Sequence, residues 1–190
     1  STYSIPQIFI KGAPLILIAL GLSVGFKANV WNIGAEGQYI MGAIFGASFA
    51  LSLYPLESIV IFPAMILIGV IGGCLWSMIP AFLKVKFQVN EILVSLMLVY
   101  VAEQILALAS LGFLRNPDGA GFPGSRNLNQ YTSASNAEII AGTGIHLGVL
   151  LSFLMVIFFY VLLFRHSLGF KIKLLGNSPK ASGFSGDNPN

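Results

Sequence analysis

The sequence predicts an all-α, polytopic integral membrane protein, a helical bundle of about five transmembrane segments in which some helices are interrupted. Of its 190 residues, 56% are hydrophobic and only 9% are charged, and the mean hydropathy is +0.84. Soluble domains carry about 25% charged residues, so this chain has too few to cover a surface that faces water. Apolar runs separated by short polar stretches recur along it, as in proteins that cross a bilayer repeatedly.

The first two apolar runs are short for a span, which needs about 20 helical residues. Ala13–Phe26 reaches that length only if Ile5–Ile10 joins it past Pro14, and Tyr39–Tyr54 only if Ala28–Trp31 contributes. Short segments interrupted by glycine or proline are typical of discontinuous helices near a transport site. The predicted segments, in chain order, are 5–26, 28–54, 59–83, 92–114 and 145–164.

The basic residues predict the orientation, because Lys and Arg accumulate in cytoplasmic loops. If the turn with Lys84 and Lys86 is cytoplasmic, seven of the ten Lys and Arg residues lie on that side and three on the other. We therefore predict an external N-terminus and a cytoplasmic C-terminal region, 165–190. The stretch 115–144, rich in turn-forming residues, is predicted to be an ordered external loop with a short helix at 134–141.

Glycines recur at helical spacing in two of these segments. Gly42 and Gly46 form one G-x-x-x-G pattern, and Gly69 and Gly73 form another. Small residues four apart let helices approach closely in lipid. Plain packing within the bundle accounts for both patterns.

A polar stretch separates the first two segments. Two glycines, Gly34 and Gly37, bracket a glutamate, and an amide side chain stands at each end; the residues of interest are Asn32, Gly34, Glu36 and Gln38. A carboxylate within the hydrocarbon costs at least about 2.5–3.5 kcal/mol. The pattern indicates a broken-helix element lining a polar path, and a solvated turn between two helices explains it equally well.

Two further polar positions mark the fourth segment. Asn90 and Glu91 open it, where Asn90 suits a helix N-cap and Glu91 suits the positive helix end. Glu103, next to Gln104, lies midway along it, where a carboxyl group needs a partner or a polar cavity. An interhelical hydrogen bond and a place on a solute path remain equal alternatives for Glu103.

The sequence offers little for catalysis. His146 and His166 stand at opposite ends of the fifth segment, roughly 30 Å apart along a helix, so they cannot share a site. No phosphate-binding Gly-Lys-Ser/Thr loop and no Cys/His cluster occurs, and Cys74 is the one cysteine. We predict no enzyme activity, no cofactor and no metal, and a net charge of +3 gives no reason to expect nucleic acid. The termini, without a starting methionine or signal peptide, suggest a piece of a longer polypeptide.

Four stretches resemble the permease subunits of bacterial ABC importers for simple sugars and nucleosides, in the branched-chain amino acid and ribose-like permease superfamily. Trp31–Gln38 (WNIGAEGQ) is close to the family's FNIGAEGQ, and Val89–Leu98 (VNEILVSLML) follows its second motif. Arg115–Gly119 (RNPDG) is similar to an external loop. Ser167–Phe170, followed by Gly176-x-x-Pro-x-Ala, is similar to a cytoplasmic segment.

The resemblance implies an assembly of two permease subunits, two cytoplasmic ATP-binding subunits and an extracytoplasmic solute-binding protein. It places 32–38 and 90–91 along the translocation path. It also implies a coupling helix within 176–186 that docks on the ATP-binding subunit. The coupling residues would be Ser178, Pro179, Lys180, Ala181 and Phe184, with Ser178 as helix cap and Pro179 in the first turn.

The sequence therefore predicts a permease subunit, in a bacterial plasma membrane, that passes a small sugar- or nucleoside-like solute while a partner hydrolyses ATP. Two other classes of protein remain open. One is an ion- or proton-coupled secondary transporter in which Glu36 and Glu103 carry protons. The other is a membrane scaffold subunit that transports nothing.

Overall fold

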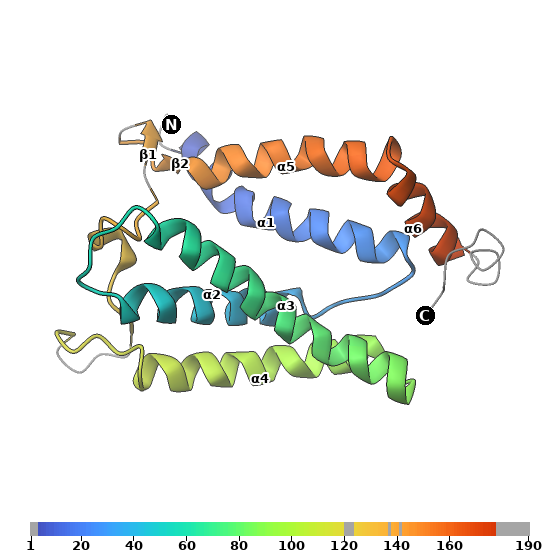
Figure 1. The fold of residues 1–190 in the computed structure, drawn as a ribbon, viewed down its shortest axis with the longest axis horizontal. Helices are drawn as coiled ribbons and strands as arrows, with labels where there is room; N and C mark the ends of the chain where they lie inside the picture. The colour runs from blue at the N-terminus through green and yellow to red at the C-terminus, as the bar shows by residue number, and fades with distance from the viewer. Residues whose placement is uncertain (1–3, 120–123, 137, 141, 178–190) are drawn as a thin grey trace. The chain divides into compact units, whose positions relative to one another are not determined.

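The computed structural model describes residues 4–119, 124–136, 138–140 and 142–177, and these are mostly helical (Figure 1). The elements, in chain order, are α1 (Ser4–Lys27), α2 (Ala35–Ser52), α3 (Ile61–Phe87), α4 (Glu91–Leu111), a 3₁₀ turn (Leu128–Gln130), β1 (Glu138–Ile140), β2 (Ile145–His146), α5 (Leu147–Phe164) and α6 (Ser167–Asn177).

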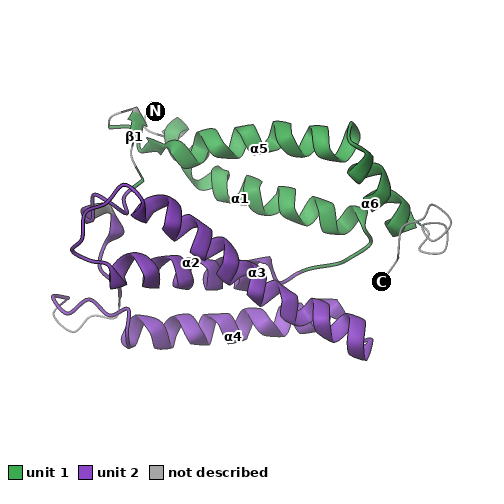
Figure 2. Cartoon of the chain, in the orientation of Figure 1, with its two compact units in different colours: residues 1–32, 136–190 green, residues 33–135 purple. Residues whose placement is uncertain are grey.

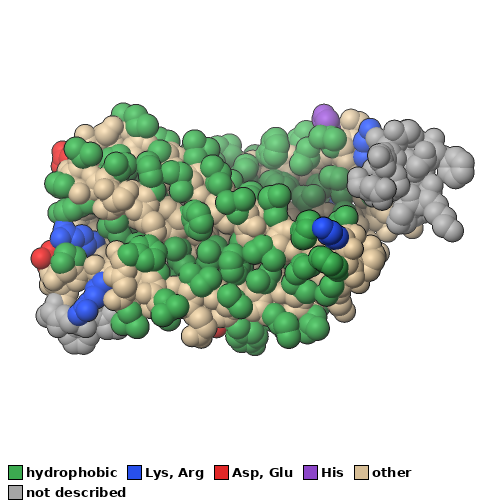
Figure 3. Space-filling view, turned by 60° about the horizontal axis from the view of Figure 1, so that its bottom comes forward, with side chains coloured by type: hydrophobic (Ala, Val, Ile, Leu, Met, Phe, Trp, Pro, Cys, Tyr) green, Lys and Arg blue, Asp and Glu red, His purple; other side chains and the backbone are tan. Residues whose placement is uncertain are grey.

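Four of the described helices, α1, α3, α4 and α5, are long and apolar enough to cross a membrane. Hydrophobic side chains also cover most of the face shown in Figure 3, where charged side chains are few. The prediction of a polytopic helical membrane bundle is confirmed. The helix outside this set, α2, has 18 residues and carries Glu36 and Gln38 in its first turn.

The break between α1 and α2 differs in position from the prediction. The first helix is continuous from Ser4 through Pro14 to Lys27, so Ile5–Ile10 does join it. Residues 28–34 are not helical, and the expectation that Ala28–Trp31 extends the second segment is wrong. The reason is local: Asn29 adopts a left-handed φ of +58°, and Val30 N–H donates to the Gly25 carbonyl at 2.9 Å. This C-cap arrangement ends a helix.

The chain divides into two compact units, residues 1–32 with 136–190, and residues 33–135 (Figure 2). In unit 1, α1 packs along α5, and α6 contacts both helices. β1 and β2 form a short antiparallel hairpin before α5. The helix predicted at 134–141 is wrong because this stretch enters the hairpin, whose turn contains Gly142 and Gly144 at φ +78° and +75°, values that favour glycine.

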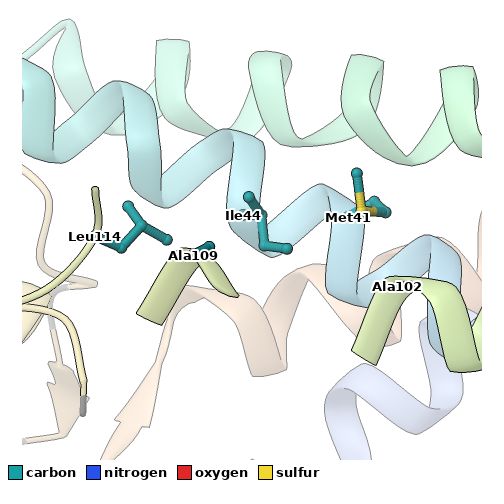
Figure 4. Packing of buried hydrophobic residues seen from close by; sticks show 5 residues of the cluster. All are labelled: Met41, Ile44, Ala102, Ala109 and Leu114. Atoms are coloured by element: carbon teal, nitrogen blue, oxygen red, sulfur yellow. The ribbon is translucent and has the colours of Figure 1, made fainter. Parts of the chain in front are cut away.

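In unit 2, α2 packs against both α3 and α4. Small and medium apolar side chains from α2 and α4, with Leu114 just beyond α4, form its buried core (Figure 4): Met41, Ile44, Ala102, Ala109 and Leu114. Ala102 and Ala109 are 0% and 1% exposed, and they are two helical turns apart on one face of α4. That small-residue face lets the larger side chains of α2 fill the space between the helices.

The glycines of α2 and α3 face one another. A Cβ on Gly42 would stand 3.0 Å from the Gly69 carbonyl oxygen, and a Cβ on Gly69 would stand 3.1 Å from the Gly42 oxygen. The same test at Gly46 and Gly73 meets the Met65 and Gln38 carbonyl oxygens at 3.1 and 3.2 Å. The prediction that these G-x-x-x-G patterns let helices approach closely is confirmed.

The described part of the loop after α4 is ordered and packs on the α2–α3 connection. The Tyr131 hydroxyl donates to the Leu56 carbonyl, and the Ser58 amide donates to Ser133 Oγ at 3.0 Å. Tyr131 is buried with Ala50 and Ile61. Burial, and after it the nearby Glu57 carboxylate, raise the pKa of the Tyr131 phenol above its usual value, so its donating form persists to higher pH.

Candidate functional site

The polar stretch 32–38 forms the entry to α2. Gly34 is the residue before the helix, with φ −88° and ψ 16°, and its carbonyl accepts from the Gln38 amide at 3.2 Å. Glu36 therefore lies in the first turn of α2. A carboxylate there is stabilised by the positive end of the helix dipole, typically by about 0.3–1 kcal/mol.

A serine of α4 anchors this entry. The Ile33 amide donates to Ser95 Oγ at 3.3 Å, and Ser95 Oγ donates to the Ile92 carbonyl at 3.1 Å. Ser95 is 2% exposed, and sequence reasoning did not single it out. The feature of the sequence that could have identified Ser95 is a hydroxyl side chain within an apolar run, one helical turn after Glu91. The hydrogen bond from Ile33 to Ser95 therefore connects the polar stretch 32–38 to α4, close to Asn90 and Glu91.

Gly37 is the point at which three helices meet. A Cβ at Gly37 would lie 3.1 Å from Val99 Cα on α4 and 3.3 Å from Trp76 Nε1 on α3. The Trp76 indole nitrogen is buried and has no hydrogen-bond partner among the described residues. The second glycine of the stretch is thus required for close approach, and Trp76 is a polar group at this junction that the sequence did not indicate.

The start of α4 is capped and paired. Asn90 Oδ1 accepts from the Ile92 amide at 3.0 Å, which confirms the N-cap prediction. The Glu91 carboxylate forms an ion pair with Lys84 Nζ at the end of α3. The end of α3 and the start of α4 therefore lie together at one end of unit 2 (Figure 1), and the entry to α2 contacts α4 one helical turn further along, at Ser95.

The two remaining predicted carboxylates are exposed. Glu36 and Glu103 are both on the surface of unit 2, and neither forms an ion pair within the described ranges. Glu103 lies one helical turn, about 6 Å, beyond Val99, so it stands outside the cluster at the start of α4. In a bilayer such groups require polar surroundings, because a lipid-facing carboxylate is costly.

The predicted coupling residues, Ser178, Pro179, Lys180, Ala181 and Phe184, lie outside the described residues. The helix that leads to them, α6, was not predicted from the sequence. Across the part of the chain that the structure describes, no three His, Cys, Asp or Glu side chains cluster in a way that could hold a metal ion.

At the other end of unit 2 the loop residues enclose a polar pocket of about 190 Å³. Arg126 pairs with Asp118 at 3.0 Å and stands 4.5 Å from the centre of the Tyr54 ring. Asn116 Oδ1 accepts from the Asp118 amide at 3.1 Å, which fixes the turn of the RNPDG stretch. These groups stabilise one another, and they account for the order of the loop.

Substitution of Asn90 separates a capping role from a role on a solute path. Asn90→Asp keeps an acceptor for the Ile92 amide, whereas Asn90→Ala removes it and is expected to cost about 1 kcal/mol of stability. We expect a lowered thermal midpoint for the alanine variant and an unchanged one for aspartate. Uptake measured on both variants then reports on the path: a loss with Asn90→Asp at unchanged stability would mean that Asn90 does more than cap α4.

A comparison with protein families finds a match to the family model described as branched-chain amino acid transport system / permease component, over residues 4–190. No solved structure matches the chain significantly.

Curated relatives named as transporter permeases are similar to the chain over nearly all its length. The glucose ABC transporter permease protein TsgB13 of Haloferax volcanii is 30% identical over 193 residues, covering 96% of this chain and 50% of the relative. The nucleoside ABC transporter permease protein NupB of Lactococcus lactis is 26% identical, covering 98% and 52%. The guanosine ABC transporter permease protein NupP of Bacillus subtilis is 24% identical, covering 91% and 49%. The chain spans about half the length of these relatives.

Proposed function

Because the chain belongs to the branched-chain amino acid transport system / permease component family, we propose that it is part of the permease subunit of an ATP-driven importer. The proposed cargo is a sugar- or nucleoside-like solute, because the relatives are named as permeases for glucose, nucleosides and guanosine. The proposed location is a bacterial plasma membrane, with the C-terminal end of the chain in the cytoplasm. Family membership identifies a transport subunit rather than an enzyme, so no covalent chemistry is assigned to this chain.

The observation that carries the proposal is the structure of the polar entry to α2. Residues 33–37 are held on α4 through Ser95 and through the close contact at Gly37, so the stretch is an ordered part of the helical bundle. Its carboxylate, Glu36, remains exposed on the surface of the unit. An ordered, charged element among apolar helices is what a path for a hydrophilic solute requires.

We assign the path to the residues predicted from the sequence, namely Asn32, Gly34, Glu36, Gln38, Asn90, Glu91 and Glu103. Within this set, Asn90 and Glu91 shape the start of α4 through the cap and the Lys84 ion pair. Glu36 and Glu103 are the exposed carboxylates of the set and are available for contact with water, solute or a second permease subunit.

The driving force would come from partner chains. Two ATP-binding subunits in the cytoplasm hydrolyse ATP, a second permease subunit completes the path, and an extracytoplasmic binding protein delivers the solute. Nucleotide binding can bias two helix arrangements only if the permease contacts the ATP-binding subunit differently in each. The region 178–184 is the proposed contact.

The test uses the full-length protein co-expressed with its partners and reconstituted in proteoliposomes. Uptake of labelled glucose or guanosine that requires enclosed ATP and the binding protein supports the proposal. Uptake that survives without ATP and collapses with an uncoupler would instead identify a secondary transporter. Absence of both an ATP-binding partner in pull-downs and any solute-dependent activity would identify a scaffold subunit.

Replacing residues 179–184 by a glycine–serine segment of equal length is expected to abolish uptake while ATP hydrolysis by the partner continues. The reason is that the replacement removes the surface through which a conformational change in the ATP-binding subunit would reach the permease. ATPase activity, uptake and co-purification are measured in parallel, and a glycine–serine replacement of 187–190, beyond the predicted coupling helix, is the control. Unchanged co-purification together with unchanged uptake would dismiss the assignment.

A further inference from the structure

The ends of α1 and α5, together with α6, enclose a cavity of about 780 Å³ within unit 1. This volume falls in the range of about 300–1,000 Å³ that small-molecule sites occupy. The residues that line it are Phe26, Lys27, Leu163, Phe164, Arg165, His166, Ser167, Gly169, Phe170, Lys173 and Asn177. None of them belongs to the proposed path in unit 2.

Two glycines of α6 let this helix lie against the backbone at the ends of α5 and α1, and one of them, Gly169, also lines the cavity. A Cβ at Gly169 would overlap the carbonyl oxygen of Leu163 in the last turn of α5. A Cβ at Gly176 would overlap the carbonyl oxygen of Lys27 at the end of α1. The helix therefore packs directly on the ends of both membrane helices.

The lining carries three cations, Lys27, Arg165 and Lys173, and no acidic residue. Among the described residues of unit 1 the acidic side chain is Glu138, which precedes α5 and so lies at its opposite end. The 18 residues of α5 separate the two ends by about 27 Å. The lining is therefore net positive, and no carboxylate in the described part of unit 1 lies close enough to neutralise it. Such a lining favours an anionic ligand.

The start of α6 adds to this preference. His166 Nδ1 accepts from the Leu168 amide at 3.2 Å, which leaves Nε2 as the protonated nitrogen of a neutral ring. Ser167 supplies a hydroxyl to the lining. It is also the first residue of α6, so the positive end of the helix dipole lies at the cavity. These groups are donors that suit phosphate oxygens.

The same cavity is partly aromatic. Phe26, Phe164 and Phe170 are 45%, 65% and 68% exposed, and Lys27 Nζ stands 3.7 Å from the centre of the Phe164 ring. Both α1 and α5 are long and apolar enough to span a bilayer, so their ends reach the level of lipid headgroups. Cations beside exposed aromatic rings at that level match a ligand with an anionic head and an apolar tail.

We infer that this cavity binds the phosphate headgroup of an anionic phospholipid, with Lys27, Arg165 and Lys173 as its ligands. Basic pockets between membrane helices are known to hold such headgroups. The bound lipid would fasten α6, and through it the chain that follows residue 177, to the membrane surface.

The test measures binding of phosphatidylglycerol labelled on an acyl chain to the full-length protein in a neutral detergent. Each cation near an anionic lipid contributes about a fivefold gain in affinity, so K27Q/R165Q/K173Q is expected to bind roughly a hundredfold more weakly. The charge-conserving variant K27R/R165K/K173R is expected to bind like the wild type. The matched control K11Q/K86Q/R115Q removes the same charge outside the cavity and is expected to keep binding.

Equal loss in the control variant, or unchanged binding in the cavity variant, would overturn the inference. Efficient competition by inorganic phosphate would also overturn it and would identify a site for a free anion. If the cavity variant loses the ATP-binding partner on co-purification but keeps lipid binding, the cavity is instead a protein interface. If the triple variant does not elute as a single species, Arg165→Gln alone replaces it, with an expected weakening of about fivefold.

Discussion

Gly42→Leu and Gly69→Leu are each expected to abolish the accumulation of folded protein. At both positions even a Cβ would stand 3.0–3.1 Å from a backbone carbonyl oxygen of the facing helix, so a single methyl group already requires the facing backbone to move by a few tenths of an ångström and a leucine side chain requires far more. Inserting methylenes into a packed core costs typically about 1–3 kcal/mol, and a whole isobutyl group between two backbones exceeds that range. The measurement is the yield of monodisperse full-length protein in size-exclusion chromatography.

Gly21→Leu is the matched control, because a Cβ there would meet nothing within 4 Å. Removing a glycine from a helix interior also gains roughly 1 kcal/mol of helix propensity, so this variant is expected to express as well as the wild type. Normal yield of the Gly42 and Gly69 variants would show that the α2–α3 contact is not needed for the fold. Loss of the Gly21 variant as well would mean that bulk anywhere in these helices is harmful.

Glu36→Gln is expected to lower solute uptake by roughly ten- to a hundredfold while leaving the yield unchanged and lowering stability by no more than the helix-dipole contribution of about 0.3–1 kcal/mol. Hydrogen bonds to charged groups contribute about 1.5–3 kcal/mol, and this exposed carboxylate has no ion-pair partner within the described residues that the substitution would disrupt. The measurement is initial uptake in proteoliposomes that contain the complete transporter. Gly34→Leu, at the buried residue before α2, is expected to lower uptake as well, by displacing the polar entry.

Glu57→Gln provides the comparison for Glu36, since Glu57 is an exposed carboxylate in the connection at the other end of α2. It is expected to transport at the wild-type rate. Wild-type uptake by both Glu36→Gln and Gly34→Leu would remove the 32–38 stretch from the solute path. The family membership would stand, but the path would have to be sought elsewhere in the bundle.

Much of the fold was predictable because it depends on local composition. Apolar length gives the spans, and the spacing of Gly42, Gly46, Gly69 and Gly73 gives a surface that tolerates close packing. The cap at Asn90 was also predictable, since its acceptor reaches only two residues along the chain. Errors arose where backbone geometry overruled composition, as at Asn29, which ends α1, and at the Gly142–Gly144 turn, which favours a hairpin over a helix.

What the sequence by itself determined is that the chain is a helical membrane protein with a polar break before its second helix, because hydropathy and glycine spacing act locally. Only the tertiary structure decided that Ser95 holds that break, that Gly37 lies against Val99 and Trp76, and that Lys27 shares a cavity with Arg165 and Lys173. These pairings join residues 39 to 146 positions apart. A contact of that kind depends on how helices pack, and no pattern within one segment encodes its partner in another.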